Sequence, residues 1–380
     1  MNYFDYAATT PMSTEALSAF TEAAQQCFGN ESSLHDEGSK AQEVLKASRT
    51  IIADSLNVPD ETVVFTSGGT ESNILAIQTL LRNKQPDKTH IIVSSLEHAS
   101  IMGHVQQLQA NGYEVDFLDH LEDGTISLKH LQYLLKNETA LLIVQHVNSE
   151  IGIIQPIAQI RQLIKEKQIF LHVDCVQSYG KIDCRPIAHY ADSLSISAHK
   201  LYGPKGVGAI IFPTIHELQP FYIRATHENG FRAGTVNVPG IYAFAIAAKT
   251  AFRTIEQNYT KMVALRKLLK NSLHLNHTQF ECVEGDNHNQ LPHIICLLFS
   301  KVQGQYVMME LNRLGFCVSS GSACQSGAKE PSKALLALGK NEDYAKSSIR
   351  ISLGLHNTEA QCEQLADAIT TTITAIHQTI

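Results

Sequence analysis

The sequence has no Cys-x-x-Cys pair and no His-Glu-x-x-His or His-x-His pattern, although its 380 residues include 18 histidines and 8 cysteines. Such patterns are the usual signature of zinc sites, and closely spaced cysteines are typical of disulfide frameworks in small secreted domains. We therefore expect no metal site and no disulfide framework. Most of the cysteines are expected to be reduced and buried.

Long basic runs and long apolar runs are also missing. Lys+Arg total 30 against 37 for Asp+Glu, which gives a net charge of -7 and does not favour direct binding to nucleic acid or to an anionic membrane. No uncharged stretch reaches the length of a membrane span, and the first residues lack the charged and apolar regions of a signal peptide. We expect a cytoplasmic protein that acts on a small molecule.

What the sequence does contain is the composition of a globular protein, with 44% hydrophobic and 18% charged residues. From residue 63 onward, short β-branched runs alternate with helical patterns such as residues 157–166, which indicates βαβ units. Apolar runs such as Leu141 to Val144 suit strands covered on both faces. The predicted fold class is α/β with a mostly parallel central sheet. Its expected strands are residues 63–66, 91–94, 141–147, 169–173, 194–196 and 208–212.

A smaller α+β domain is expected as well, because the chain is long for a single core. After Phe212 the pattern changes, and a Gly- and Pro-containing segment leads into a long helical stretch, residues 241–273. We predict a large domain over residues 13–258 and a small domain made of residues 1–12 and 259–380. Expected elements of the small domain are strands at residues 293–298 and 316–319 and helices at residues 305–314 and 359–377.

Polar residues follow several of the predicted strands, at the edge where open α/β sheets bind ligands. Residues 66–72 open a helix whose free N–H groups can bind a phosphate, and an ordinary helix start is the alternative. The flat ring of His98 can stack on a flat cofactor or can be a structural group. Asn148 and Asp174 follow the next two strands, with turn formation and helix capping as their alternatives.

Lys200 ends the fifth predicted strand, one βαβ unit after Asp174, so that both side chains can face one pocket. A lysine at a strand end is normally a solvated charge. This combination, however, is what pyridoxal phosphate (PLP) requires: a lysine for the Schiff base, a carboxylate beside the pyridine nitrogen, donors for the phosphate and a ring over the cofactor. Once freed by the substrate, Lys200 can act as the base at the substrate Cα.

Many of these residues belong to motifs spread over nearly the whole chain. They are YFDYAATTP (3–11), FGN (28–30), TSGGTES (66–72), EH (97–98), HVNSEIG (146–152), Asp174 with Gln177, SAHK (197–200), RAGT (232–235), GSAC (321–324) and SIRISLG (348–354). In this order and spacing they resemble the cysteine desulfurases of the NifS/IscS type, in the class V aminotransferase superfamily. The resemblance implies a PLP-dependent transferase of fold type I.

The resemblance also implies roles for individual residues. Thr235 would come from the partner subunit of a homodimer, and Arg350 would bind the substrate carboxylate, with Asn148 nearby. His98 would stack on the cofactor ring and take part in catalysis. Phosphate contacts would come from Thr70, Ser197, His199 and Thr235. The full set of implied cofactor-binding residues is Gly69, Thr70, His98, Asn148, Asp174, Gln177, Ser197, His199, Lys200 and Thr235.

Cys324 decides the implied chemistry. It lies in a polar, Gly-containing segment, which favours a reactive thiol over a buried structural cysteine. By resemblance, Cys324 takes the sulfur of L-cysteine as a persulfide, and L-alanine is released. The sulfur would then pass to acceptor proteins, such as an iron–sulfur scaffold, a tRNA-thiolating enzyme or a dedicated client.

Other functions remain open from the sequence. Selenocysteine lyase activity is the alternative within the class V enzymes, whereas kynureninases and aminotransferases need no thiol such as Cys324. A catalytically inactive scaffold would be expected to have lost Lys200, Asp174 or Cys324. A nucleotide-binding protein is disfavoured because Glu71 follows Thr70, where a Walker motif would continue with lysine.

Overall fold

Seven strands form the central sheet in the order β2-β8-β7-β6-β5-β3-β4, in a computed structural model that describes residues 1–275, 280–286, 288–321 and 331–379. All neighbouring strands from β4 to β7 pair in parallel, and only β8 runs antiparallel to both of its neighbours. The prediction of a mostly parallel sheet is therefore confirmed. The strands are β2 (Val63–Thr66), β3 (His90–Ser94), β4 (Glu114–Leu118), β5 (Thr139–Gln145), β6 (Phe170–Asp174), β7 (Ser193–Ser197) and β8 (Gly208–Ile211).

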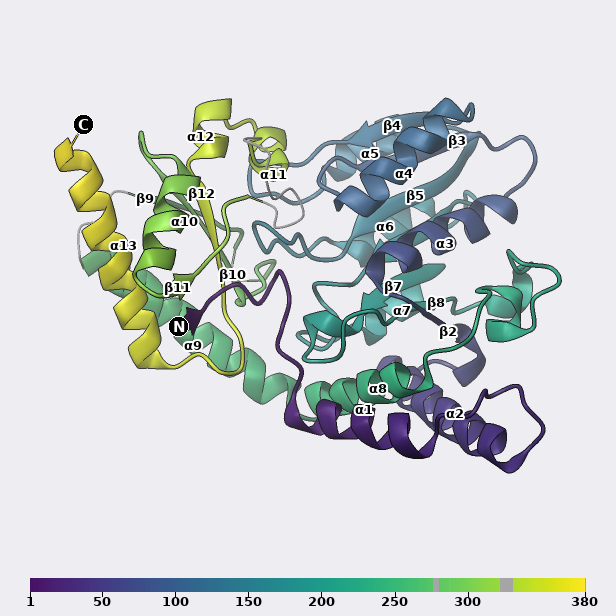
Figure 1. The fold of residues 1–380 in the computed structure, drawn as a ribbon. Helices are drawn as coiled ribbons and strands as arrows, with labels where there is room; N and C mark the ends of the chain where they lie inside the picture. Colours follow the sequence, from purple (N-terminus) through teal and green to yellow (C-terminus); the bar gives the residue numbers. More distant parts are fainter. Residues whose placement is uncertain (276–279, 287, 322–330, 380) are drawn as a thin grey trace.

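Helices cover both faces of this sheet, which explains the continuous apolar run in β5. Leu141 and Ile143 pack toward α3 and α4 on one face, while Leu142 and Val144 pack into a core on the other face. Figure 1 shows α1, α2 and α8 together along one side of the large part of the molecule. The helices are α1 (Thr14–Gln26), α2 (Asp36–Leu56), α3 (Gly69–Arg82), α4 (Ala99–Ala110), α5 (Leu128–Leu134), α6 (Ile157–Ile164), α7 (Arg185–Tyr190) and α8 (Val238–Arg253).

Strand β4 and the long helix after β8 differ from the prediction. Strand β4 was missed because it pairs only with β3 at the sheet edge, so that Glu114 and Phe117 are exposed and no apolar run marks it. The predicted helix over residues 241–273 is two helices, α8 and α9 (Ile255–Leu275), which meet at Thr254. The Thr254 hydroxyl donates to the Thr250 carbonyl, a local bond that favours bending of a helix.

The C-terminal part contains an antiparallel sheet, in the order β12-β10-β9, and the N-terminus returns to this part. Strand β1 pairs in parallel with β11, and the buried Phe4 packs in one cluster with Leu297 of β10 and Ile369 of α13. These contacts support the predicted division into two domains, which stays a prediction; its limit, between residues 258 and 259, falls inside α9. Remaining elements are β1 (Asn2–Tyr3), β9 (Phe280–Val283), β10 (Ile294–Phe299), α10 (Gly304–Arg313), β11 (Phe316–Cys317), α11 (Lys333–Ala337), α12 (Glu342–Lys346), β12 (Ser348–Ser352) and α13 (Glu359–Thr379).

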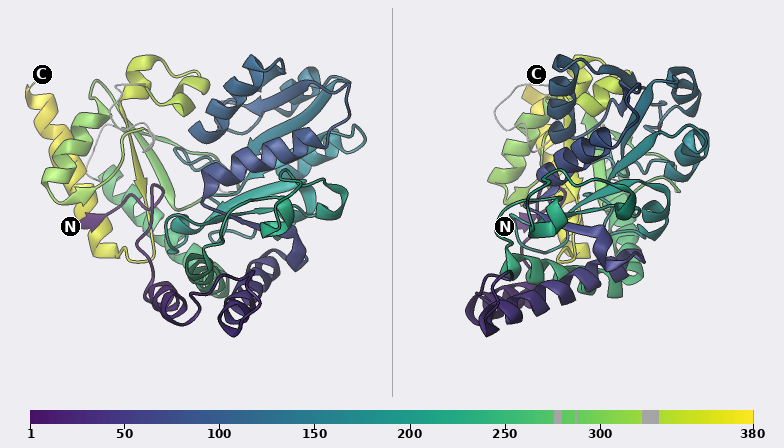
Figure 2. Two further views of the ribbon diagram at one scale, coloured as in Figure 1. Left: turned by 45° about the vertical axis from the view of Figure 1, so that its right-hand side comes forward. Right: turned by 90° about the vertical axis from the view of Figure 1, so that its right-hand side faces the viewer.

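The left view of Figure 2 shows the small part beside the large part, and the right view looks onto the large part with the small part behind it. Within the described ranges, no helix combines the length and the apolar character that a membrane crossing requires. The seven cysteines of the described ranges form no disulfide bond.

Replacing Leu142 by alanine should lower the free energy of unfolding by about 2–5 kcal/mol, because the fully buried side chain leaves a cavity at the centre of the sheet. Urea denaturation at constant temperature measures this change. Leu17→Ala is the matched control, since this α1 side chain is 53% exposed. Equal losses in the two variants would contradict the assigned position of Leu142.

Candidate functional site

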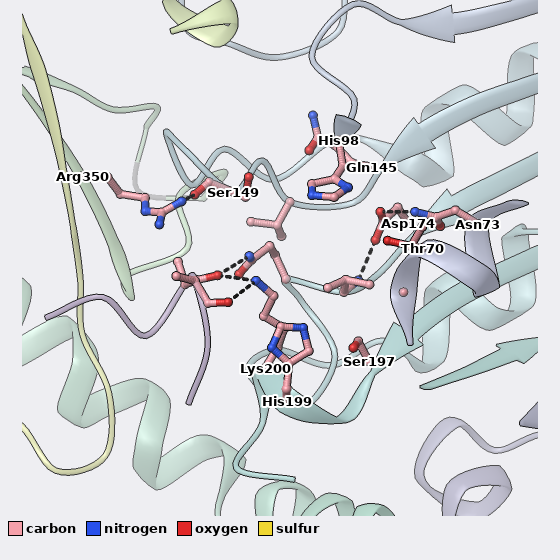
Figure 3. A pocket seen from close by; sticks show the side chains of 16 residues that line it. Thr70, Asn73, His98, Gln145, Ser149, Asp174, Ser197, His199, Lys200 and Arg350 are labelled. Carbon is pink, nitrogen blue, oxygen red and sulfur yellow. Dashed lines mark hydrogen bonds between the residues drawn. The ribbon is translucent and has the colours of Figure 1, made fainter. Parts of the chain in front are cut away.

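A pocket of about 190 Å³ lies where the strands β5, β6 and β7 end. Figure 3 shows side chains from the sheet, from the N-terminal segment and from β12 around it. Nine of the predicted site residues line this pocket, and these are Gly69, Thr70, His98, Asp174, Gln177, Ser197, His199, Lys200 and Arg350. Residues that line it without having been predicted are Ala7, Ala8, Asn73, Gln145, Val147, Ser149 and Val176.

Lys200 lies in a short 3₁₀ helix, Ala198–Lys200, directly after β7. Its ammonium group donates to the carbonyl oxygens of Ala7, at 2.6 Å, and of Ala8, at 2.8 Å. Both acceptors belong to the N-terminal segment, which the sequence analysis included in a motif without assigning it a role. Backbone carbonyls carry no side-chain signal, so that only the fold reveals them as partners of the lysine.

Asp174 is the last residue of β6, and its carboxylate is held from two sides. Oδ2 accepts a hydrogen bond from Asn73 Nδ2 at 2.9 Å, and Oδ1 accepts one from the Val176 N–H at 2.8 Å. Asn73 in turn contacts His172 Nε2 through its Oδ1 at 3.1 Å, and burial lowers the pKa of His172 to about 3. This chain fixes the orientation of the carboxylate toward the pocket.

Asn73 was missed by the sequence analysis, although a signal was present. It lies on α3 four residues after Gly69, and side chains at this separation lie on the same face of a helix. A polar residue on the inner face of a helix that begins at the pocket is a candidate for a contact there. Its side chain is 1% exposed, so its hydrogen bonds must be made within the protein.

The start of α3 borders the pocket and has no side-chain cap. Its N-cap, Gly68, has φ of +146° and offers no side chain to cap the first turn, so the N–H groups of that turn lack a side-chain acceptor. A Cβ at Gly69 would lie 2.9 Å from Val176 Cγ2, which explains the need for glycine at the pocket wall. The Ser197 hydroxyl faces this turn, and its oxygen is buried without a hydrogen-bond partner. A phosphate group would satisfy these donors.

His98 caps α4 and lies in the view of Figure 3 on the opposite side of the pocket from Lys200. Its Nδ1 is 2.9 Å from the Ser100 hydroxyl, a contact that fixes the plane of the ring. The adjacent Glu97 is buried and accepts a hydrogen bond from the Gln145 N–H at 2.6 Å. Burial, followed by repulsion from Asp174, raises the pKa of Glu97 to about 8.

Cationic groups gather on the other side of the pocket. Arg350 donates through Nη1 to the Ser149 carbonyl at 3.0 Å and through Nη2 to the Asp5 carboxylate at 2.8 Å. Its Nε is buried without a partner, so the guanidinium keeps a donor for an anion. Burial lowers the pKa of Lys181 to about 7, with Lys200 and Arg350 contributing.

His199 and Gln177 border the pocket through contacts of their own. Burial, followed by the charge of Lys200, lowers the pKa of His199 to about 4, so its imidazole is neutral at neutral pH. Gln177 donates through Nε2 to the Ala7 carbonyl and accepts from Lys181 Nζ, both at 3.0 Å.

Two predicted residues lie outside the pocket, and a third is not among the described residues. Asn148 is not among the pocket-lining residues, and its Oδ1 accepts hydrogen bonds from the Glu150 and Ile151 N–H groups, as in the turn-forming alternative. Thr235 is exposed on a loop outside the pocket of its own chain. Cys324 lies outside the described residues. The roles predicted for these residues stay predictions.

The residues of the pocket fit PLP. Unsatisfied donors at the α3 turn and at Ser197 match a phosphate, Asp174 presents a fixed carboxylate, and Lys200 supplies an amine. The donor set lies at one edge of the sheet, where the ends of parallel strands meet.

Comparisons with known proteins agree with this geometry. Residues 2–365 match the family model described as aminotransferase class-V. A protein of Bacillus subtilis (strain 168) named "Putative cysteine desulfurase NifS" is 43% identical over 97% of this chain and 94% of its own length. Cysteine desulfurase IscS 1 of Archaeoglobus fulgidus is 36% identical over 97% of this chain and 96% of its own length. The solved structure of a NifS-like protein has a TM-score of 0.90 and 28% identity, covering 98% of this chain and 99% of its own.

Replacing Glu97 by glutamine should reduce the loss of stability as the pH rises from about 5 to about 8. The folded-state pKa of Glu97, about 8, is above its ordinary value, so its stabilising contribution is present at low pH and is lost as the pH rises through 8. Urea unfolding at several pH values, compared between the two proteins, measures this slope. The surface variant Glu22→Gln is the control. If Glu97→Gln leaves the dependence of the unfolding free energy on pH unchanged, the raised pKa of Glu97 is contradicted.

Proposed function

Because the chain belongs to the class V aminotransferase family, among its PLP-dependent cysteine desulfurases of the NifS/IscS type, we propose that it removes sulfur from L-cysteine in the pocket around Lys200. L-alanine is one product, and a persulfide on Cys324 is the other. The observation that carries this proposal is that Lys200, Asp174 and Arg350 face one pocket, although they come from distant parts of the sequence.

The pocket residues divide the binding of the cofactor among them. Asp174 would hold the pyridine nitrogen, and Thr70, Ser197 and the first turn of α3 would bind the phosphate. Lys200 would hold the cofactor through its aldehyde carbon. When bound, PLP withdraws electrons from the substrate Cα and so weakens its bonds. His98 would lie against the cofactor ring, where its contact with Ser100 keeps the imidazole in one plane.

Arg350 would bind the substrate carboxylate. Its bonds to Asp5 and to the Ser149 carbonyl hold the guanidinium plane in place before substrate arrives, so little side-chain entropy is lost on binding. Lys200 would then move the proton at the substrate Cα. The carbonyls of Ala7 and Ala8 bind its ammonium form, and they would steady the lysine after it has accepted that proton.

The sulfur transfer uses Cys324. Its thiolate would attack the substrate sulfur, so that an S–S bond forms while the substrate C–S bond breaks. The carbon left behind takes up a proton and becomes the methyl group of alanine, so cysteine plus enzyme thiol balances alanine plus enzyme persulfide. No outside oxidant or reductant is needed for this step.

Assembly, acceptors and location are further parts of the proposal. We propose a homodimer in which Thr235 of each chain reaches the pocket of the partner subunit, which would account for its exposed position in one chain. The persulfide sulfur would pass to a protein acceptor, such as an iron–sulfur scaffold or a tRNA-thiolating enzyme. A cytoplasmic location agrees with the unpaired thiols of the described cysteines.

Replacing Cys324 by serine should abolish alanine formation from L-cysteine while the yellow colour of the bound cofactor is retained. The reason is that Lys200 and Asp174 stay in place, whereas the nucleophile for sulfur is lost. Alanine assays and visible spectra of one preparation measure both properties. Cys317→Ser is the control, and undiminished alanine formation by Cys324→Ser would refute the proposed nucleophile.

Replacing Arg350 by alanine should lower kcat/KM for L-cysteine roughly a hundredfold, the equivalent of about 3 kcal/mol for charge-assisted hydrogen bonds to a carboxylate. Most of the change is expected in KM, because the carboxylate is bound in both ground and transition states. Steady-state kinetics at saturating cofactor measure it. Arg350→Lys keeps the charge and loses the planar fork, so it should recover only part of the activity. Unchanged KM in Arg350→Ala would contradict the role.

A further inference from the structure

A second group of reactive side chains lies next to the pocket and has no part in the proposed reaction. The ligand atoms of His146, Cys175 and Cys184 all lie within 4.8 Å of one another. Both cysteines are completely buried, and His146 is 4% exposed. None of the three lines the pocket, so the group is separate from the substrate site.

The sheet itself holds two of these residues in place. His146 directly follows β5, and its N–H donates to the Asp174 carbonyl at 2.8 Å. Cys175 directly follows β6, and its N–H donates to the Ser195 carbonyl at 2.9 Å. Cys184 is the N-terminal flanking residue of α7. Side chains fixed by ordered backbone in this way form a rigid ligand set.

One polar atom of the group is left unpaired. The Nδ1 of His146 is buried and has no hydrogen-bond partner. Buried polar atoms of native proteins nearly always have a partner, so the unpaired nitrogen of this ring points to a missing one. A metal ion would use such a lone pair.

We propose that His146, Cys175 and Cys184 bind one thiophilic cation, zinc or copper(I), directly behind the cofactor pocket. Metal–sulfur and metal–nitrogen bonds of about 2.3 Å and 2.1 Å place two ligand atoms of a tetrahedral site about 3.6–3.8 Å apart, so the three groups need to close by about 1 Å. On binding, each thiol loses its proton, and the two thiolates balance the charge of a divalent ion.

Zinc and copper(I) differ in the number of ligands that they require. Soft thiolate ligands select both of them, but zinc prefers four ligands, and copper(I) accepts fewer. The buried Ser178 lies beside the group, with its hydroxyl donating to the Cys175 carbonyl at 3.2 Å. A zinc ion would take a fourth ligand here, such as this hydroxyl or a water molecule.

The bound ion would tie together the strand ends that carry the pocket. His146 follows the pocket-lining Gln145, and Cys175 follows Asp174, the residue proposed to hold the pyridine nitrogen. The cation would therefore link the ends of β5 and β6 next to the pocket, and Cys184 would connect both to the start of α7.

Metal analysis of the purified holoenzyme tests the proposal. The protein is prepared in a Cys324→Ser background, so that the proposed sulfur-accepting thiol adds no ligand, and is reconstituted with Zn²⁺ or Cu⁺ under reducing conditions. We expect one tightly held ion per chain after gel filtration. Cys175→Ser and Cys184→Ser should each lose it, and Cys362→Ser, a buried cysteine of α13, should retain it.

X-ray absorption is measured on the metal-loaded protein that keeps His146, Cys175 and Cys184. This measurement tests the proposal even if a cysteine variant fails to fold. Two sulfur neighbours at about 2.3 Å and at least one nitrogen at about 2.1 Å are expected. An absorption spectrum with oxygen and nitrogen neighbours alone would overturn the proposal. Failure of the protein to retain either metal would also overturn the proposal. The same holds if the Cys175→Ser and Cys184→Ser variants retain as much metal as the protein with both cysteines. Recovery of Cys175 and Cys184 as a disulfide from the freshly purified protein would also overturn it.

Discussion

The hydrogen bonds from the Lys200 ammonium to the carbonyls of Ala7 and Ala8 connect the large sheet to the N-terminal segment. Lys200 belongs to the end of the large sheet, whereas the N-terminal segment pairs with the small part through β1 and β11. Thr10 adds to this junction, because its N–H and its hydroxyl both donate to the His199 carbonyl at 2.9 Å. The N-terminal segment therefore forms part of the pocket wall, through Ala7 and Ala8.

The charges around this junction determine what the pocket can accept. Lys200 and Arg350 line one side of the pocket, with Lys181 bound to the lining residue Gln177, and Asp174 places a carboxylate on the other side. The pKa of Lys181 falls to about 7 because burial and two neighbouring cations oppose its protonation. An anionic substrate or phosphate in the pocket would relieve this repulsion. Glu97, with its raised pKa, adds little negative charge at neutral pH and leaves Asp174 as the principal anion beside β6.

Much of this arrangement could be predicted from the sequence because the physical signals are local. The apolar run in β5 predicts a strand covered on both faces. Asp174 and Lys200 lie at or just after the ends of neighbouring parallel strands, and such ends meet at one edge of the sheet. The edge strand β4 gave no such signal, since half of its side chains face solvent. The predicted strand over residues 141–147 extends two residues beyond the end of β5, because after Gln145 the chain turns and Val147 bridges to Ile154 instead.

Contacts that depend on the backbone or on distant segments could not be predicted in this way. Ala7 and Ala8 act through carbonyl groups, which every residue has. Asn148 illustrates the opposite problem: its amide type suits a ligand contact, yet its oxygen is occupied by the N–H groups of its own turn. Only the folded structure tells whether such a polar atom is available.

The position of Arg350 bears on how a thiol can reach the substrate. Burial is the main cause that raises the pKa of Cys282 to about 11 and that of Cys362 to about 11, so these thiols are protonated and poor nucleophiles at neutral pH. No cysteine of the described ranges lines the pocket. Ser319 is five residues before Cys324 in the sequence and exchanges two backbone hydrogen bonds with Arg350. The Ser319 N–H donates to the Arg350 carbonyl at 3.1 Å, and the Arg350 N–H donates to the Ser319 carbonyl at 2.7 Å. The described chain therefore passes beside the proposed carboxylate-binding residue five positions before residue 324 in the sequence.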